Sequence, residues 1–377
     1  MLKGFYLTLL VGPVVPVPVP QSFLDALTSV EVNIKSGRRA QSGFQLKFNL
    51  SNKSPLHTLF LLAGTSPLPL IRVIVIVTLN GTPAVLMDGV VTKQDNSPGS
   101  GAGHSTVTIT GTDLTTVMNL IAFDGFPFPA MPPEARVALM IAKYAMFGMV
   151  PLVIPSVLID VPIPTERIPR QQGTDYDYIN QLADNVGYVF YLDPGPAPGM
   201  NLAYWGPLIK VGPPQPALNI NMDAHTNVES LSFNFNADSK QLPVLFIQNL
   251  ISKVPIPIPI PDITPLNPPL GLVPPLSLKV NLIEGTAKLS PVQAALIGLA
   301  KAAQSSDAVF GSGTLDVLRY GRILKARQLV GVRGAGTAFD GLYYVDSVTH
   351  NIKRGEYKQS FSLSRNGLIS TLPRVPV

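Results

Sequence analysis

Two β-rich runs near the C-terminus, separated by a short polar link, limit the architectures open to this chain. Residues 342–349 and 357–363 are rich in tyrosine, phenylalanine, valine and serine, and Gly355 lies in the link between them. The pattern predicts an antiparallel hairpin over residues 341–368. No residue in this stretch stands in a pattern typical of a reaction centre.

The first third of the chain also has the periodicity of β-strands. Residues 44–50 alternate strictly between apolar and polar side chains, and Val30, Val32 and Ile34 repeat this alternation one strand earlier. Residues 71–79 are a nearly continuous Val/Ile run, which predicts a strand covered on both faces. A fourth strand is expected at residues 107–110, and residues 95–103 are expected to form a flexible loop.

The middle of the chain combines helices with a hairpin. Pro132 and Pro133 open a predicted helix whose apolar side chains follow helical spacing through Tyr144. A second helix is expected to begin at Thr174 or Asp175 and to end at Gly187. Two strands should follow, over residues 188–192 and 200–205, with a turn at residues 193–195.

Residues 255–275 form a proline tract whose other side chains are mainly isoleucine, leucine and valine. Proline lacks an N–H, so we expect this segment to be extended or polyproline II and to take no part in ladder pairing. It is either a linker or an arm, and its apolar composition favours an arm that lies against another surface, which we expect to be a neighbouring subunit. Ser290 and Pro291 then predict a helix over residues 291–304.

These elements predict a mainly β fold with an α+β insert. The expected organisation is a first β domain at residues 1–112, a mixed α/β domain at 113–215 and a second β domain at 216–377. A length of 377 residues agrees with two to four domains. Only 14% of residues are charged and 46% are hydrophobic, so much side-chain surface must be hidden, either in a subunit interface or in a membrane.

Two segments resemble membrane or targeting sequences. Residues 137–150 could span about 21 Å as a helix, which is short of a bilayer core of about 30 Å. They also contain Lys143, so a buried helix is favoured over insertion in a membrane. The N-terminal apolar run resembles a signal peptide, but four prolines follow it between residues 13 and 20 and no small-residue cleavage pattern appears, so a cleaved signal is not favoured.

Composition gives no support for metal, disulfide or nucleic-acid chemistry. The chain has no cysteine, and its four histidines do not follow a ligand spacing; they are His57, His104, His225 and His350. The net charge of +5 is modest for this length, and a dedicated nucleic-acid binder usually has a denser basic stripe. We expect no cofactor, no metal and no specific nucleic-acid partner.

The remaining candidate motifs have simpler explanations than catalysis. Gly331, Gly334 and Gly336 resemble a phosphate loop, but neither the Lys-Ser/Thr pair nor a helix follows, so a turn between strands is expected. Asp175 and Asp177 fall where a helix N-terminus favours negative charge, and Asp184 follows in the same helix. The sequence contains neither the G-x-S-x-G nucleophile elbow nor the H-E-x-x-H zinc motif. We therefore expect no catalytic residue.

One basic cluster stands out near the C-terminus. It consists of Arg319, Arg322, Lys325, Arg327 and Arg333. These side chains either form a solvated face, or they line a channel or meet an acidic partner, and the sequence does not decide between the two.

Three groups of segments resemble the phage late control D family, the baseplate hub proteins of contractile tails. The segments are residues 25–32 with 44–48, residues 110–114 with 175–183 and 187–191, and residues 315–321, 330–336, 339–345 and 350–357. The resemblance extends over most of the chain, and the C-terminal group is the most specific. The proline-rich stretches depart from the family pattern, which leaves open what residues 255–275 contact.

The resemblance implies a structural protein and no enzyme. Such hubs are trimers in which each subunit has two tube-like antiparallel β-barrel domains, so that six barrels match a sixfold tail tube above a threefold spike. The implied partners are two more copies of the chain, the inner tube protein, other baseplate subunits and a spike protein, which is expected as a separate chain because only nine residues follow Leu368. The resemblance implies assembly in the bacterial cytoplasm, into an injection system or a phage tail. The sequence of the C-terminal segments favours an extracellular or cell-anchored injection system.

Two other classes remain open at this point. The first is a cell-wall hydrolase carried by a tail, and the second is a membrane-associated β protein. Fold-level resemblance alone does not fix function.

Overall fold

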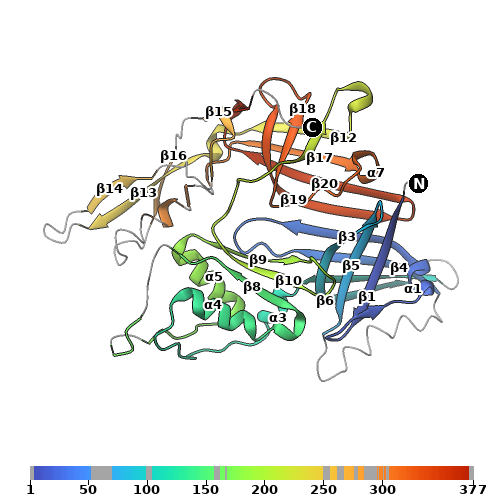
Figure 1. Cartoon of the computed structure of the whole chain (residues 1–377), viewed down its shortest axis with the longest axis horizontal. Helices are drawn as coiled ribbons and strands as arrows, with labels where there is room; N and C mark the ends of the chain where they lie inside the picture. Colours follow the sequence, from blue (N-terminus) through green and yellow to red (C-terminus); the bar gives the residue numbers. More distant parts are fainter. Residues whose placement is uncertain are drawn as a thin grey trace.

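The computed structural model describes residues 4–51, 70–98, 104–156, 162–165, 168–248, 255–260, 267–275, 279–283, 295, 297–299, 301–302 and 305–372. Figure 1 shows two groups of strands stacked one above the other, with a helical part beside the lower group and a hairpin that projects to the left. Within the described residues, no helix is long and apolar enough to cross a bilayer.

The first β region contains every strand predicted for it. Its elements are β1 (Phe5–Gly12), β2 (Val17–Pro18), α1 (Gln21–Ala26), β3 (Leu27–Lys35), β4 (Gly43–Ser51), β5 (Arg72–Leu79), β6 (Thr82–Pro98) and β7 (His104–Asp113). The alternation over residues 44–50 is confirmed in β4, where Phe44, Leu46 and Phe48 are buried and Lys47 and Asn49 are exposed. Burial on both faces is also confirmed for most of β5.

The prediction of a loop from residue 95 is wrong over its first part. Strand β6 continues to Pro98, and Asp95 pairs with Thr108 of β7. Polar side chains at Asp95, Asn96 and Ser97 suit an exposed hairpin arm as well as they suit a loop. Residues 99–103 lie outside the described residues.

The insert packs two helices on a small sheet. Its elements are α3 (Thr115–Met118), α4 (Pro133–Ala142), η1 (Ala145–Phe147), β8 (Met149–Val153), α5 (Asp175–Val186), β9 (Val189–Pro194) and β10 (Asn201–Gly206). The caps of α5 are confirmed, since the Thr174 hydroxyl accepts the N–H of Asp177 and Gly187 ends the helix at φ 72°. Trp205, fully buried, lies in a core that also contains Val137 and Ile179.

The prediction of one helix over residues 137–150 is wrong. The helix α4 ends at Ala142, and Gly148 takes a left-handed conformation with φ 71° that redirects the chain. Residues from Met149 onward then form β8, which pairs in parallel with β10. The apolar character of the segment therefore comes from a helix and a strand that share one core.

The second β region holds the predicted C-terminal hairpin. Its elements are β11 (Gln215–Asn219), η2 (Asp223–His225), β12 (Val228–Phe235), η3 (Ala237–Ser239), β13 (Gln241–Gln248), β14 (Pro255–Pro259), β15 (Gly271–Val273), β16 (Lys279–Ile283), β17 (Val309–Asp316), α7 (Val317–Tyr320), β18 (Leu329–Arg333), β19 (Gly341–Lys353), β20 (Glu356–Arg365) and β21 (Leu368–Ser370). Strands β19 and β20 form that hairpin, and Gly355 turns it at φ 78°.

The proline tract pairs with other strands, contrary to the expectation. Residues 255–259 are extended as predicted, but β14 forms an antiparallel ladder with β13 in which Ile256 pairs with Ile247 and Ile258 with Leu245. Because every second residue of a strand directs its N–H to the same side, prolines at alternate positions can all lie on the outer edge. Strand β15 pairs with β21, and residues 261–266 lie outside the described residues.

The predicted helix at residues 291–304 lies largely outside the described residues. Those that are described within it, namely 295, 297–299 and 301–302, are helical.

Strands of both β regions belong to one sheet. Its main path runs β12-β17-β20-β19-β3-β4-β7-β6-β5-β1-β2, and β11 and β18 attach beside β19. The long strand β19 pairs with β18 through residues up to Tyr344 and with β3 from Ser347 onward, with a bulge between Val345 and Ser347. The fold is mainly β with an α+β insert, as predicted. The domain boundaries at residues 112 and 215 stay a prediction.

Candidate assembly surface

One side of this sheet is a broad polar surface. In an antiparallel ladder, directly opposed residues direct their side chains to the same face. Ser232, Ser312, Ser362, Ser347 and Lys35 are successive partners across β12, β17, β20, β19 and β3. The hydroxyls of Ser347 and Ser362 lie 2.6 Å apart, and those of Ser232 and Ser312 lie 3.1 Å apart.

The next row repeats this chemistry. Ser230, Thr314, Ser360, Thr349 and Asn33 follow one another across the same five strands. The hydroxyls of Ser230 and Thr314 are 2.8 Å apart. Two adjacent rows therefore present hydroxyl and amide groups, with Lys35 as the single charge.

Two further rows continue the surface onto β4, β7 and β6. The first is Asp316, Lys358, Asn351, Glu31, Gln45, Thr110 and Lys93, and the second is Glu356, Lys353, Ser29, Lys47, Thr108 and Asp95. We call the residues of these four rows the polar face. Each of them is at least partly exposed.

The opposite side of the same strands is the main core. Val348 and Phe361 are buried between the hydroxyl rows of the hairpin, and Leu46 and Ile109 are buried between the polar residues of β4 and β7. Period-two alternation sends one set of side chains to the core and the other to solvent. The polar face is therefore backed by the hydrophobic core that packs on the other side of the same strands.

Strand β12 ends the main path of the sheet. Its only ladder partner among the described residues is β17, and no described strand pairs with its other edge. The side chain of Phe235 near its end is 40% exposed. A long open edge of this kind can pair with a strand of another chain.

A buried ion pair joins the first β region to the insert. Arg72 of β5 and Asp88 of β6 meet in two parallel hydrogen bonds of 2.7 Å each. Both side chains are buried, at 3% and 0% exposure. The Asn201 amide donates to the same carboxylate at 2.8 Å, and Arg72 also donates to the carbonyls of Phe147 and Gly199. The position of the insert is thus fixed by a connected polar network.

Arg327 is a second junction, and it does not belong to a solvated basic face. Its guanidinium donates to the Lys35 carbonyl at 2.8 Å and to the Leu192 carbonyl at 3.3 Å. It also lies 4.0 Å from the centroid of the Tyr191 ring. One side chain therefore connects the second β region, β3 and the insert.

The other members of the basic cluster lie elsewhere. Arg319, Arg322 and Lys325 are exposed on α7 and the loop after it, and Arg333 ends β18. None of the five lies in the rows that make up the polar face. Gly334 and Gly336, with φ of 83° and 96°, form the turn that follows β18, as predicted.

The three aspartates of α5 have three separate roles. Asp175 is buried and accepts hydrogen bonds from Lys143, Tyr144 and Gln171 at 2.8 Å each. Asp177 contributes to the Thr174 cap, and Asp184 pairs with Arg38. The helix does not bring these carboxylates to one site.

The histidines are also separated. His350 is buried in β19, where its Nδ1 lies 2.7 Å from the Tyr357 hydroxyl, and burial lowers its pKa to about 3. His225 is exposed in η2 and His104 lies in β7, whereas His57 is outside the described residues. Within the described part of the chain, no group of histidine and acidic side chains could hold a metal ion.

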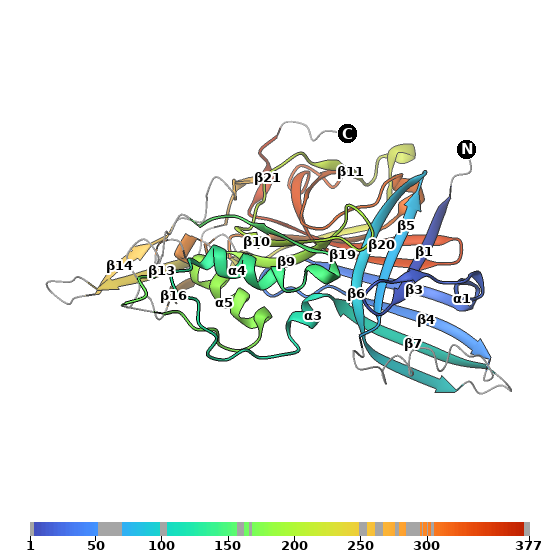
Figure 2. The same ribbon diagram turned by 60° about the horizontal axis from the view of Figure 1, so that its bottom comes forward.

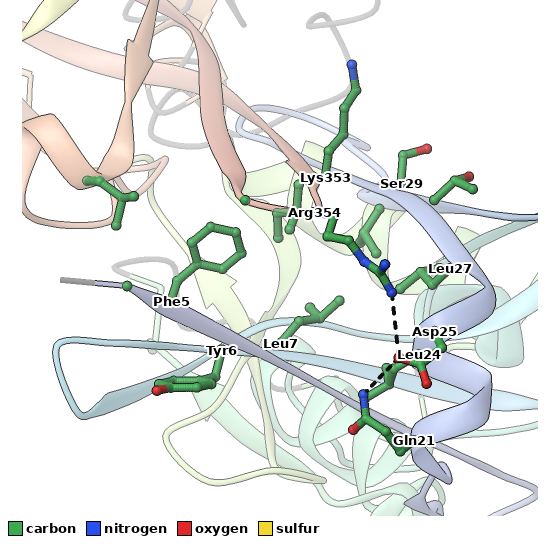
Figure 3. A pocket seen from close by; sticks show the side chains of 16 residues that line it. Phe5, Tyr6, Leu7, Gln21, Leu24, Asp25, Leu27, Ser29, Lys353 and Arg354 are labelled. Atoms are coloured by element: carbon green, nitrogen blue, oxygen red, sulfur yellow. Dashed lines mark hydrogen bonds and ion pairs between the residues drawn. The ribbon is translucent and has the colours of Figure 1, made fainter. Parts of the chain in front are cut away.

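An open groove of about 450 Å³ lies between β1, α1 and the tip of the β19–β20 hairpin. Figure 3 shows Arg354 reaching toward Asp25, at 3.6 Å, while Gln21 donates to the same carboxylate at 3.2 Å. Phe5 and Leu7 supply its apolar side. Asp25 is the single carboxylate among the described residues that line the groove, whereas glycoside hydrolysis ordinarily uses two.

Sequence reasoning missed the polar face and the Arg72 network. The signal for the polar face is present in β20, where Ser360 and Ser362 alternate with Phe361 and Leu363. No local pattern pairs Arg72 with Asp88, because that contact depends on the register of two strands.

The fold is shared with proteins of phage tails and of type VI secretion. A tail protein from Neisseria meningitidis superposes with a TM-score of 0.63 at 12% identity, over 97% of this chain and 98% of its own. The 43 kDa tail protein of prophage MuSo2 from Shewanella oneidensis gives 0.61 at 13% identity, over 96% and 98%.

A type VI secretion component of Escherichia coli, c3393, gives a TM-score of 0.53 at 10% identity, over 93% of this chain and 78% of its own. That protein is described as structurally similar to the bacteriophage T4 tail proteins gp27 and gp5. No family model matches this sequence, and no curated protein matches it. At these identities the similarity is one of fold: the chain has the fold of phage tail and type VI secretion proteins over nearly its whole length.

Proposed function

We propose that this chain is the structural hub of a contractile injection system or a contractile phage tail. Three copies form a ring that adapts a sixfold inner tube to a threefold spike, and the hub catalyses no reaction. The spike, the tube protein and other baseplate subunits are separate partners. The particle is assembled in the bacterial cytoplasm.

The observation that carries this proposal is the near-complete correspondence with the two bacterial tail proteins. The match includes 97% of this chain and 98% of the Neisseria protein, so the similarity extends to the whole order of β region, insert and β region. A single shared domain would support much less, because one domain fold serves many functions.

The open edge of β12 supports assembly from several copies. A second copy can extend the sheet along the edge that runs from Val228 to Phe235. Low charge content supports it as well, since apolar surface that a monomer would expose can be covered by neighbouring subunits.

The test measures the mass of the purified full chain by light scattering and images the particle by electron microscopy. We expect a trimer with threefold symmetry and a central pore. The variant Phe235→Glu introduces a charge at the edge strand and is expected to weaken the trimer. The control Leu139→Glu changes a residue of α4 that is also exposed, at 44%, and should leave the trimer intact.

A monomer at physiological salt would overturn the proposal. Release of soluble fragments when the purified chain is incubated with peptidoglycan would also overturn it, because a structural hub should not hydrolyse a substrate.

A further inference from the structure

The connection between the insert and the second β region is held by a buried lysine. Lys210 lies between β10 and β11, and its Nζ is 2.6 Å from a carboxylate oxygen of Asp307, which precedes β17. The Lys210 side chain is 4% exposed and that of Asp307 is 15% exposed. Lysine is seldom buried this deeply, and burial strips both ions of their hydration. The pair therefore differs from the exposed pair of Lys93 and Asp95.

A second carboxyl group shares the pocket of this pair. Lys210, Asp307 and Asp346 line one pocket of about 600 Å³, together with the aromatic side chains of Tyr344 and Phe310. The Lys210 ammonium lies 5.4 Å from the centroid of the Tyr344 ring. Burial, and then the charge of Asp307, raise the pKa of Asp346 to about 6, whereas Lys210 opposes the shift. A carboxyl group with this pKa can both give and take a proton near neutral pH.

The backbone on both sides of the pocket is held by hydrogen bonds. The Asp307 carbonyl accepts the Ser239 hydroxyl at 2.7 Å, and the Asp346 carbonyl accepts the Ser36 N–H at 2.8 Å. A nitrogen 2.6 Å from a carboxylate oxygen is roughly 3 to 3.5 Å from the carboxyl carbon, which is the separation of two groups in position to react. The fold therefore presents an amine, a carboxyl carbon and a proton donor at one place.

We propose that Lys210 and Asp307 condense into an isopeptide bond, with Asp346 as the proton relay, and that this bond joins the connection after the insert to the start of β17. The inference does not rest on the proposed hub function. It concerns only groups within one copy of the chain.

The reaction balances without any other reactant. The lone pair of Lys210 Nζ attacks Cγ of Asp307, so that a C–N bond forms and one C–O bond of the carboxyl group breaks. Of the three protons on the ammonium group, one stays on the amide nitrogen and two leave with the departing oxygen as water. Asp346 gives one proton to that oxygen and takes one from the nitrogen, so it ends in the state in which it began. Burial favours the product, because a neutral amide replaces two desolvated charges.

The bond closes a covalent loop within the second β region. The loop from Lys210 to Asp307 contains β11 to β16, and thus the projecting hairpin of β13 and β14. A cross-link that closes a long loop stabilises a fold mainly by restricting the unfolded chain. Force applied to the insert is then carried to β17 by a covalent bond, where an ion pair would yield.

Mass spectrometry of the intact, purified full chain tests the proposal. We expect a mass about 18 Da below that calculated for the linear chain, because one water leaves with each bond. Trypsin does not cleave at a lysine held in an amide, so digestion should release residues 171–240 joined to residues 302–319. Lys210→Arg keeps the positive charge without the attacking amine and should show no loss of water. The matched variant Lys93→Arg, in the exposed pair, should still show it.

The relay is tested with Asp346→Asn, which keeps the size of the side chain and removes its carboxyl proton. In a time course of cell-free synthesis we expect the bond to form at least about tenfold more slowly than in the parent. Circular dichroism that matches the parent shows that the variant is folded. For stability measurements, variants of Asp346 are compared in a Lys210→Arg parent, so that loss of the bond is not mistaken for an electrostatic effect.

Three results would overturn the inference. An intact mass equal to that of the linear chain would show that the pair stays ionic, and in a particle that is trimeric it would leave the hub function untouched. A loss of water that persists in Lys210→Arg would place the dehydration elsewhere in the chain. An unchanged rate in folded Asp346→Asn would remove the relay. A monomer in light scattering, by contrast, contradicts the hub function and not the bond.

Discussion

The guanidinium of Arg327 lies over the ring of Tyr191, 4.0 Å from its centroid, although the two residues belong to different parts of the chain. Only 7% of the Arg327 side chain is exposed. Burial raises the pKa of Tyr191, and the Arg327 cation above its ring opposes that shift. The contact holds the insert against the place where β3 and β19 meet.

Replacing Arg327 by alanine should lower the free energy of unfolding by about 2 to 4 kcal/mol. The variant loses a cation–π contact and leaves the carbonyls of Lys35 and Leu192 without their donor. Urea unfolding of the full chain gives the value. Arg322→Ala removes an exposed arginine and should change stability by less than about 0.5 kcal/mol. Equal effects of the two substitutions would show that Arg327 is not a junction.

Breaking the Arg72–Asp88 pair should lower the free energy of unfolding far more than breaking a surface ion pair does. Asp88→Asn leaves a buried guanidinium without its counter-charge, and we expect a loss of about 3 to 5 kcal/mol. The matched substitution Asp95→Asn breaks the exposed pair with Lys93 and should change stability by less than about 1 kcal/mol. Denaturant titration of both variants provides the comparison, and similar losses would contradict the role given to the buried network.

Local periodicity was sufficient to predict several strands of the sheet, namely β3, β4, β5, β7, β19 and β20. The alternation in β4 and the two runs of the β19–β20 hairpin lie where the sequence predicts them, because one face of each strand is buried in a single core. The caps of α5 were predictable for a similar reason, since Thr174 and Gly187 act within one turn of the chain.

Contacts between distant segments were not predictable in this way. The pairing of β19 with β3 joins residues more than 300 positions apart, and it depends on a bulge at Val345 that has no signature in the sequence. The ladder of β14 was missed because proline content was weighed without regard to its period of two. The helix expected over residues 137–150 failed because apolar runs of strand and helix look alike.

Asp346 should make the fold less stable at neutral pH than at pH 4. Burial and the nearby Asp307 raise its pKa from 3.8 to about 6, although Lys210, which pairs with Asp307 at 2.6 Å, opposes the shift. The folded chain therefore binds this proton more tightly than the unfolded chain does. The associated stability is fully present below pH 4 and is lost as the pH rises to about 6.

The substitution Asp346→Asn removes this loss. At pH 8 the variant should be more stable than the parent by about 2 to 3 kcal/mol, and at pH 4 the two should be nearly equal. Asp25→Asn alters an exposed carboxyl and serves as the control. Thermal unfolding at both pH values decides the matter, and a parent that is more stable than the Asp346 variant at pH 8 would contradict the argument.

His350 should have the opposite dependence on pH. Its imidazole is buried in the neutral form, with Nδ1 2.7 Å from the Tyr357 hydroxyl, and burial lowers its pKa from 6.5 to about 3. The unfolded chain therefore takes up a proton below pH 6.5 that the folded chain excludes. Stability that is present above pH 6.5 is lost as the pH falls, by roughly 4 kcal/mol at pH 3.

The variant His350→Gln cannot take up this proton. Its free energy of unfolding should fall less steeply than that of the parent between pH 6.5 and 4, even though the variant starts from a lower value at pH 7. Subtracting the two curves cancels the contribution of the carboxyl groups, which titrate in both proteins. His225→Gln changes an exposed histidine, and its difference from the parent should stay flat with pH. If the two differences have the same slope, the buried neutral imidazole is not what makes this fold sensitive to acid.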